Sequence, residues 1–135
     1  MSRVLTLVNQ KGGVGKTTTA INLSAYLGQF GRKVLLVDLD PQANATSSLG
    51  INKYEVKCGT YEILIGSEPF SPHILANPNL KINLLPSSPS LAGAEVELIT
   101  VTERESPLRE PLKPVLDRYD HIIIDCPPSL SLLTV

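Results

Sequence analysis

The chain has 135 residues, of which 42% are hydrophobic and 4% aromatic, and its formal net charge is −1. This length suits one modest domain with an aliphatic core, and the hydrophobic content excludes a disordered chain. The near-zero charge gives no sign of a nucleic-acid or membrane surface, and no apolar run approaches the roughly 20 residues that span a bilayer. The two cysteines, Cys58 and Cys126, form no disulfide or metal pattern, so we expect a reduced, cytoplasmic setting.

The first part of the chain predicts a strand, a loop, a helix and a second strand. Arg3–Asn9 is a continuous β-branched and leucine run, which is typical of a strand buried on both faces. Gln10–Gly15 is rich in glycine and predicts a loop. From Lys16 the pattern becomes helical, with one face formed by Ala20, Leu23, Ser24 and Leu27. Gly31 is placed to end this helix in a left-handed conformation, and Lys33–Asp38 predicts a parallel strand reached by a right-handed crossover.

The middle of the chain is less regular. Ala43–Leu49 and Thr60–Ile65 predict short helices. Glu68–Asn79 contains three prolines, so we expect a loop or broken turns there. Lys81–Leu85 predicts a third strand.

The last part predicts two more helices and a fourth strand. Leu91–Val101 has a helical pattern, and Ser106–Arg118 begins with a serine cap and a proline suited to the first helical position. Pro111 and Pro114 fit that helix poorly, so we expect a kink or a later start. His121–Asp125 is a buried strand. Together these elements predict an α/β sandwich with a mostly parallel, four-stranded sheet.

A glycine-rich segment joins the first strand to the first helix. Glycines let backbone N–H groups approach phosphate oxygens, and the helix N-terminus adds free N–H groups and partial positive charge. Lys16 would reach the β- and γ-phosphates of a nucleotide, and the Thr17 hydroxyl would ligate Mg²⁺. The alternative is a glycine-rich turn with an incidental lysine. The candidate nucleotide-binding residues are Lys11, Gly12, Gly13, Val14, Gly15, Lys16, Thr17 and Thr18.

This segment departs from the usual G-x-x-x-x-G-K-[ST] pattern, because Gln10 occupies the position of the first glycine. The sequence N-Q-K-G-G-V-G-K-T-T-T, from Asn9 to Thr19, instead resembles the deviant Walker A motif of the ParA/MinD superfamily. The resemblance implies a P-loop ATPase in which Lys11 reaches the partner's phosphates across a nucleotide-sandwich dimer. Such a lysine would act as an arginine finger does. The alternative is a solvated loop lysine.

Three aspartates lie at the carboxyl ends of predicted strands, where open α/β sheets bind ligands. Asp38 and Asp40 end the second strand, and Asp125 ends the fourth. The resemblance implies that Asp40 positions the attacking water, that Asp38 lies near the Mg²⁺ waters, and that Asp125 is a Walker B carboxylate. Cys126-Pro127-Pro128 would be the switch that follows it. The alternative for Asp38 and Asp40 is a pair of acidic residues that cap a turn.

The segment D-P-Q-A-N-A-T, from Asp40 to Thr46, resembles the ParA/Soj partition proteins and differs from MinD-like proteins. The cysteines do not match the cluster ligands of nitrogenase iron-protein relatives. His73 and His121 lack a metal or nucleophile pattern, so each is interpreted as a surface or satisfied histidine.

The resemblance implies a cytoplasmic ATPase of chromosome or plasmid partition that binds ATP and Mg²⁺, forms a homodimer and slowly hydrolyses the nucleotide. A ParB-like protein and non-specific DNA would be its partners, and no membrane is expected. Family members run to roughly 250 residues, one ordinary α/β domain, so residues 1–135 would be its N-terminal part, and the DNA surface would lie in the other half. Two alternatives remain: a MinD-like membrane ATPase, and a non-enzymatic remnant that binds nucleotide weakly or only dimerises.

Overall fold

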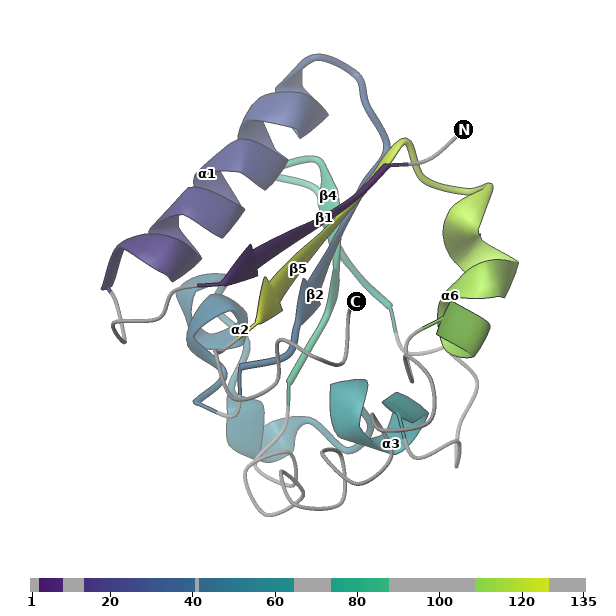
Figure 1. The fold of residues 1–135 in the computed structure, drawn as a ribbon. Coiled ribbons are helices and arrows are strands. Elements are labelled where there is room, and N and C mark those ends of the chain that lie inside the picture. Colours follow the sequence, from purple (N-terminus) through teal and green to yellow (C-terminus); the bar gives the residue numbers. More distant parts are fainter. Residues whose placement is uncertain (1–2, 9–13, 41, 65–73, 88–108, 127–135) are drawn as a thin grey trace.

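The computed structural model describes residues 3–8, 14–40, 42–64, 74–87 and 109–126. These segments form a β-sheet with helices on both faces (Figure 1). The predicted helix Leu91–Val101, the predicted helix start at Ser106, the loop residues Lys11, Gly12 and Gly13, and His73 all lie outside the described residues.

The sheet is mostly parallel and has the strand order β1-β5-β2-β4-β3. β1 (Arg3–Val8) and β2 (Val34–Asp38) both pair in parallel with β5 (His121–Cys126), which lies between them. β4 (Ile82–Leu85) pairs in parallel with the other edge of β2. The carboxyl ends of these four strands therefore lie side by side along one edge of the sheet, which is the edge formed by strand ends and not by an outer strand.

The expected four strands are present, but the sheet has a fifth. β3 (Leu75–Asn77) pairs antiparallel with β4, in a segment where the prolines predicted a loop or broken turns. That prediction was wrong for residues 75–77, because a strand of three residues is too short to show a hydrophobic period; residues 68–73 lie outside the described residues. Pro78 lies immediately after the strand, where its missing N–H removes no bond from the ladder.

The core consists of two hydrophobic clusters, one on each face of the sheet, because successive strand residues point to opposite faces. The first cluster lies under α3 (Thr60–Leu64) and α6 (Arg109–Leu116), and its members include Leu35, Val37, Ile122, Ile124, Ile63, Leu112 and Val115. The second lies under α1 (Val14–Gln29) and α2 (Asn44–Ser48), and its members include Val34, Leu36, Ile123, Ala20 and Ala45. Figure 1 shows α1 and α6 on opposite sides of the strands, which gives a three-layer α/β/α arrangement.

Helix α1 (Val14–Gln29) begins two residues earlier than its pattern predicted and ends where predicted. Gly31 has a φ of 79°, which favours glycine. The Arg32 N–H donates to the Leu27 carbonyl at 3.2 Å, so the chain closes the helix with a left-handed turn. The predicted inner face is confirmed, since Ala20 and Ser24 are fully buried.

The remaining helices are short. α2 (Asn44–Ser48) and α3 (Thr60–Leu64) confirm the two helices predicted there, and a 3-10 turn, η1 (Lys53–Glu55), separates them. α6 spans Arg109–Leu116 and contains Pro114, which removes one helical hydrogen bond.

β1 forms one edge of the sheet within the described residues. Its apolar side chains are partly uncovered: Val4 is 45% exposed and Leu5 is 39% exposed. No described helix is long and apolar enough to cross a membrane.

Candidate nucleotide and magnesium site

The first turn of α1 lies just beyond the carboxyl end of β1, as the glycine-rich motif predicts. Val14, Gly15, Lys16 and Thr17 form the beginning of the helix backbone. Thr18 follows them and is exposed. Figure 1 shows this helix end beside the carboxyl ends of the parallel strands, and the first turn of a helix has N–H groups without partners inside the helix.

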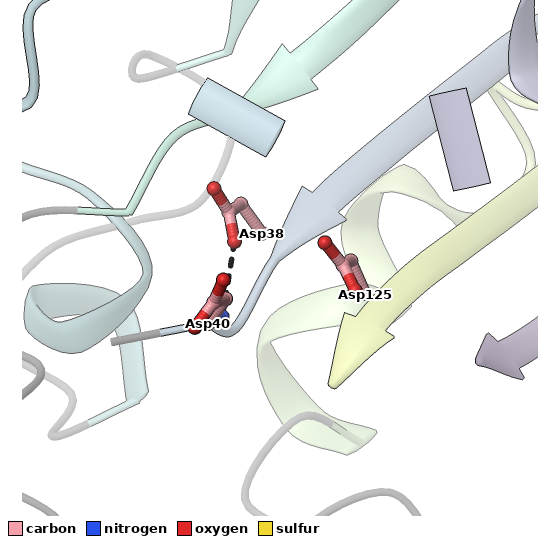
Figure 2. A group of neighbouring side chains, drawn as sticks. All are labelled: Asp38, Asp40 and Asp125. Atoms are coloured by element: carbon pink, nitrogen blue, oxygen red, sulfur yellow. Dashed lines mark hydrogen bonds between the residues drawn. The ribbon is translucent and has the colours of Figure 1, made fainter. Parts of the chain in front are cut away.

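The structure brings Asp38, Asp40 and Asp125 together at the same edge (Figure 2). Asp38 is the last residue of β2, and its backbone is in register with Asp125 on the neighbouring strand β5. Asp40 follows two residues later. All three are buried, and one carboxylate oxygen from each lies within 4.8 Å of the others.

The Asp38 carboxylate accepts three hydrogen bonds from described residues. Its Oδ1 accepts from the Asp40 N–H at 3.0 Å, drawn in Figure 2. Its Oδ2 accepts from the Thr46 N–H at 2.9 Å and from the Thr46 hydroxyl at 2.6 Å. The pKa of Asp38 is raised to about 7, mainly by burial; hydrogen bonds from Thr46 and Asp40 oppose the rise, and the nearby Asp125 carboxylate adds to it least. The site therefore favours a proton, or a cation, close to Asp38.

The Asp40 carboxylate is held by the turn that follows it. Its Oδ1 accepts from the Gln42 N–H at 2.9 Å, and its Oδ2 accepts from the Asn44 side-chain amide at 2.8 Å and the Asn44 N–H at 3.3 Å. Ala43 adopts a left-handed conformation, with φ 56° and ψ 41°, which turns the chain into α2. Asp40 does help to form a turn, as the alternative interpretation expected, and the same turn fixes its carboxylate beside Asp38.

Sequence reasoning missed the polar residues that support this pair. Thr46, Ser87 and Thr60 are fully buried. The Thr60 hydroxyl lies 3.0 Å from the Pro86 carbonyl and also contacts the Asp38 carbonyl, so it joins the ends of β2 and β4. A Cβ on Gly59 would collide with the Pro86 carbonyl, so this close approach requires glycine. Asn44 and Thr46 belong to the D-P-Q-A-N-A-T segment, but that pattern does not reveal which atoms they contact.

The donor set fits a hard divalent cation. Mg²⁺ prefers oxygen ligands and commonly keeps several of its waters, which suits carboxylates that already accept hydrogen bonds. Among the described residues, these three aspartates form the one group of three or more Asp, Glu, His or Cys side chains that lie close enough together to bind one metal ion. Cys58 forms no disulfide among the described residues and lies outside that group.

The opposite end of the sheet has a different character. A cavity of about 540 Å³ there is lined by Arg32, Lys33, Val34, Lys81, Asn83, Asp117, Arg118 and Tyr119. None of the predicted site residues lines it. His121 is half-buried at the start of β5, and its Nδ1 is buried without a hydrogen-bond partner among the described residues, so the expected satisfied histidine is wrong for that atom.

Comparison with known proteins gives a consistent match. The AAA domain family matches residues 2–135. The sporulation initiation inhibitor protein Soj of Bacillus subtilis is 49% identical over 135 residues, covering 100% of this chain and 53% of Soj. A Mycobacterium smegmatis structure described as cobyrinic acid a,c-diamide synthase with bound ATP analog and magnesium is 43% identical, with a TM-score of 0.90, covering 99% of this chain and 55% of that one. The septum site-determining protein MinD of Pyrococcus horikoshii, complexed with Mg-ADP, is 34% identical, with a TM-score of 0.77, covering 98% and 52%.

The α/β/α arrangement and these solved neighbours define the fold as that of a P-loop NTPase. Within that class, the chain belongs to the ParA/Soj family and corresponds to its N-terminal half. It spans about half the length of the curated relatives that it matches.

Proposed function

We propose that this chain is the nucleotide-binding and catalytic half of a Mg-ATP-dependent partition ATPase. The observation that carries the proposal is the meeting of the α1 N-terminus with three buried aspartates at one edge of the sheet. An anion would be stabilised by the partial positive charge of the helix end, and a cation between that anion and the carboxylates would balance the negative charge of both. The solved relatives with bound Mg-ADP or with an ATP analog and magnesium support this interpretation.

Each motif residue then has a distinct task. The loop and first turn bind the phosphates, with Lys16 at the terminal phosphates and Lys11 acting across a dimer. Asp40 orients the attacking water, because among the described residues its Oδ1 accepts one hydrogen bond, from the Gln42 N–H, which leaves a lone pair for water. Thr17, Asp38 and Asp125 hold Mg²⁺, directly or through its waters. When bound, Mg²⁺ supplies positive charge against the phosphate oxygens.

Relatives that are named as partition proteins favour partition over the other functions that this fold supports. The chromosome partitioning protein ParA of Myxococcus xanthus is 48% identical to this chain, and the D-P-Q-A-N-A-T segment resembles partition proteins and differs from MinD-like proteins. The proposal therefore includes ATP-dependent homodimerisation, a ParB-like partner, and non-specific DNA bound through the other half of the protein, in the cytoplasm. A MinD-like membrane role and amide synthesis, as named for the mycobacterial relative, are the competing functions.

Steady-state hydrolysis of ATP separates these possibilities. We expect slow, Mg²⁺-dependent hydrolysis that rises when DNA and a ParB-like protein from the same source are added together. Stimulation by phospholipid vesicles instead would favour the MinD-like role. Turnover that requires an amide donor and a carboxylate substrate would favour the synthase, and failure to bind ATP would leave a non-enzymatic remnant.

A further inference from the structure

A buried hydrogen-bond network joins the aspartates to the exit of strand β4. The Thr46 hydroxyl donates to Asp38 Oδ2 at 2.6 Å and accepts from the Ser87 N–H at 3.0 Å. The Ser87 hydroxyl in turn donates to the Asp40 carbonyl at 2.8 Å. Ser87 lies two residues beyond the end of β4. This one residue therefore contacts both Thr46, which binds the Asp38 carboxylate, and the backbone of Asp40.

The direction of these bonds is fixed by chemistry. The Ser87 N–H can only donate, so Thr46 Oγ1 must accept from it, and when Asp38 is ionised the single Thr46 proton is directed to its carboxylate. Only a hydroxyl can accept one bond and donate the other in this space. Serine could replace Thr46 in this role, whereas valine, which has a similar shape, would leave the buried Ser87 N–H without a partner.

The network also fixes the backbone of Asp40 on both sides. Its N–H donates to Asp38 Oδ1 at 3.0 Å, and its carbonyl accepts from Ser87. Among the described residues, the Asp40 carboxylate is otherwise held by the turn that follows, through Gln42 and Asn44, so its direction also depends on that backbone. A small shift at Ser87 or Thr46 therefore moves the group that faces the reacting water.

An ordinary buried hydroxyl in the same chain behaves differently. Ser24 is as fully buried as Thr46, but its hydroxyl donates to the Ala20 carbonyl of its own helix at 2.7 Å. That bond satisfies a polar group and reaches no site residue. The bonds of Thr46 and Ser87, by contrast, connect residues 8 and 47 positions apart and end on the two aspartates.

We propose that Thr46 and Ser87 are positioning residues for ATP hydrolysis, which together hold Asp40 in register with Asp38 and link that register to the exit of β4. The inference rests on the proposed ATPase function. Both side chains are fully buried and their hydroxyls bond within the network, so we expect nucleotide affinity to depend on them weakly and turnover to depend on them strongly.

The test uses the full-length protein with Thr46→Val, Thr46→Ser, Ser87→Ala and, as a matched buried-hydroxyl control, Ser24→Ala. We expect Thr46→Val to lower kcat by about 10- to 100-fold with the Kd for Mg-ATP changed by less than about threefold, since misplacement of about 1 Å costs that much rate. Thr46→Ser should recover most of the rate. Combining Thr46→Val with Ser87→Ala should lower kcat by less than the product of the separate effects, because both act through Asp40.

Amide hydrogen exchange of residues 39–46 gives a readout that needs no catalysis. Thr46→Val should speed exchange there, whereas Ser24→Ala should lower the melting temperature without doing so. Unchanged exchange in Thr46→Val, an unchanged kcat, or an equal loss of kcat in Ser24→Ala overturns the inference. A wild-type protein that binds no Mg-ATP overturns the proposed ATPase function and the catalytic role of the network together. The exchange result then still decides whether Thr46 and Ser87 order the turn.

Discussion

Burial of Asp38 predicts that the folding stability of the metal-free protein falls as pH rises. The pKa of this carboxyl rises from its ordinary value of 3.8 to about 7, so the folded chain holds the proton more tightly than the unfolded chain. Its contribution to stability is therefore fully present below pH 3.8 and is lost as pH rises through about 7. A rise of this size corresponds to roughly 4 kcal/mol, with a slope of at most about 1.4 kcal/mol per pH unit.

The perturbation that isolates this effect is Asp38→Asn. The amide keeps one acceptor for Thr46 but places an NH₂ group against the Asp40 N–H, so the variant starts from a lower stability. The slope with pH is thus the informative quantity. Asp117→Asn, which removes an exposed carboxylate, is the control for charge alone.

The assay is urea unfolding, followed by circular dichroism, at several values between about pH 4 and 8. The wild-type free energy of unfolding should fall relative to Asp38→Asn across this window, and the Asp117→Asn curve should follow the wild type. An excess of Mg²⁺ should flatten the wild-type slope, because a cation favours the ionised carboxylate. A difference between wild type and Asp38→Asn that stays constant with pH would refute the argument from burial.

Three further predictions concern turnover and the sheet edge. Lys11→Ala in the full-length protein should leave ATP binding by the monomer intact but impair ATP-dependent dimerisation and turnover; normal light scattering and hydrolysis would return Lys11 to a solvated loop. The Asp40→Ala variant should bind Mg-ATP and dimerise but hydrolyse ATP about 10²–10⁴-fold more slowly. The Asp125→Ala variant should in addition bind Mg-ATP more weakly, as measured by calorimetry. Identical behaviour of the two variants would contradict the different roles given to Asp40 and Asp125. The 135-residue chain alone should hydrolyse ATP poorly and self-associate through the uncovered edge of β1. Val4→Lys should reduce that association, as measured by sedimentation. A monodisperse wild-type chain with full-length activity would show that this strand edge needs no cover.

Local patterns in the sequence predicted the elements that position the site. The apolar runs predicted β1, β2, β4 and β5 to within one residue at each described end, and Gly31 predicted the end of α1. Lys81 was expected in a strand, but it has a φ of 57° and belongs to the preceding turn. These features could be found because each depends on neighbouring residues.

Features that depend on distant residues could not be predicted in this way. The insertion of β5 between β1 and β2 decides that Asp125 lies opposite Asp38, yet no pattern within either strand encodes that order. The contact between Thr46 and Ser87 joins residues 41 positions apart. Serine and threonine are common in loops, so their types alone do not indicate that these two support the site.

The central claim is that the α1 N-terminus and the three aspartates form one Mg-ATP site. The most direct test is calorimetric titration of the full-length protein with ATP, with and without Mg²⁺, for wild type and Lys16→Ala. The account predicts saturable, Mg²⁺-dependent binding to the wild type and no measurable binding to Lys16→Ala, because this lysine supplies the charge that meets the terminal phosphates. Equal affinity of the two proteins for Mg-ATP would contradict the assignment of the phosphate loop.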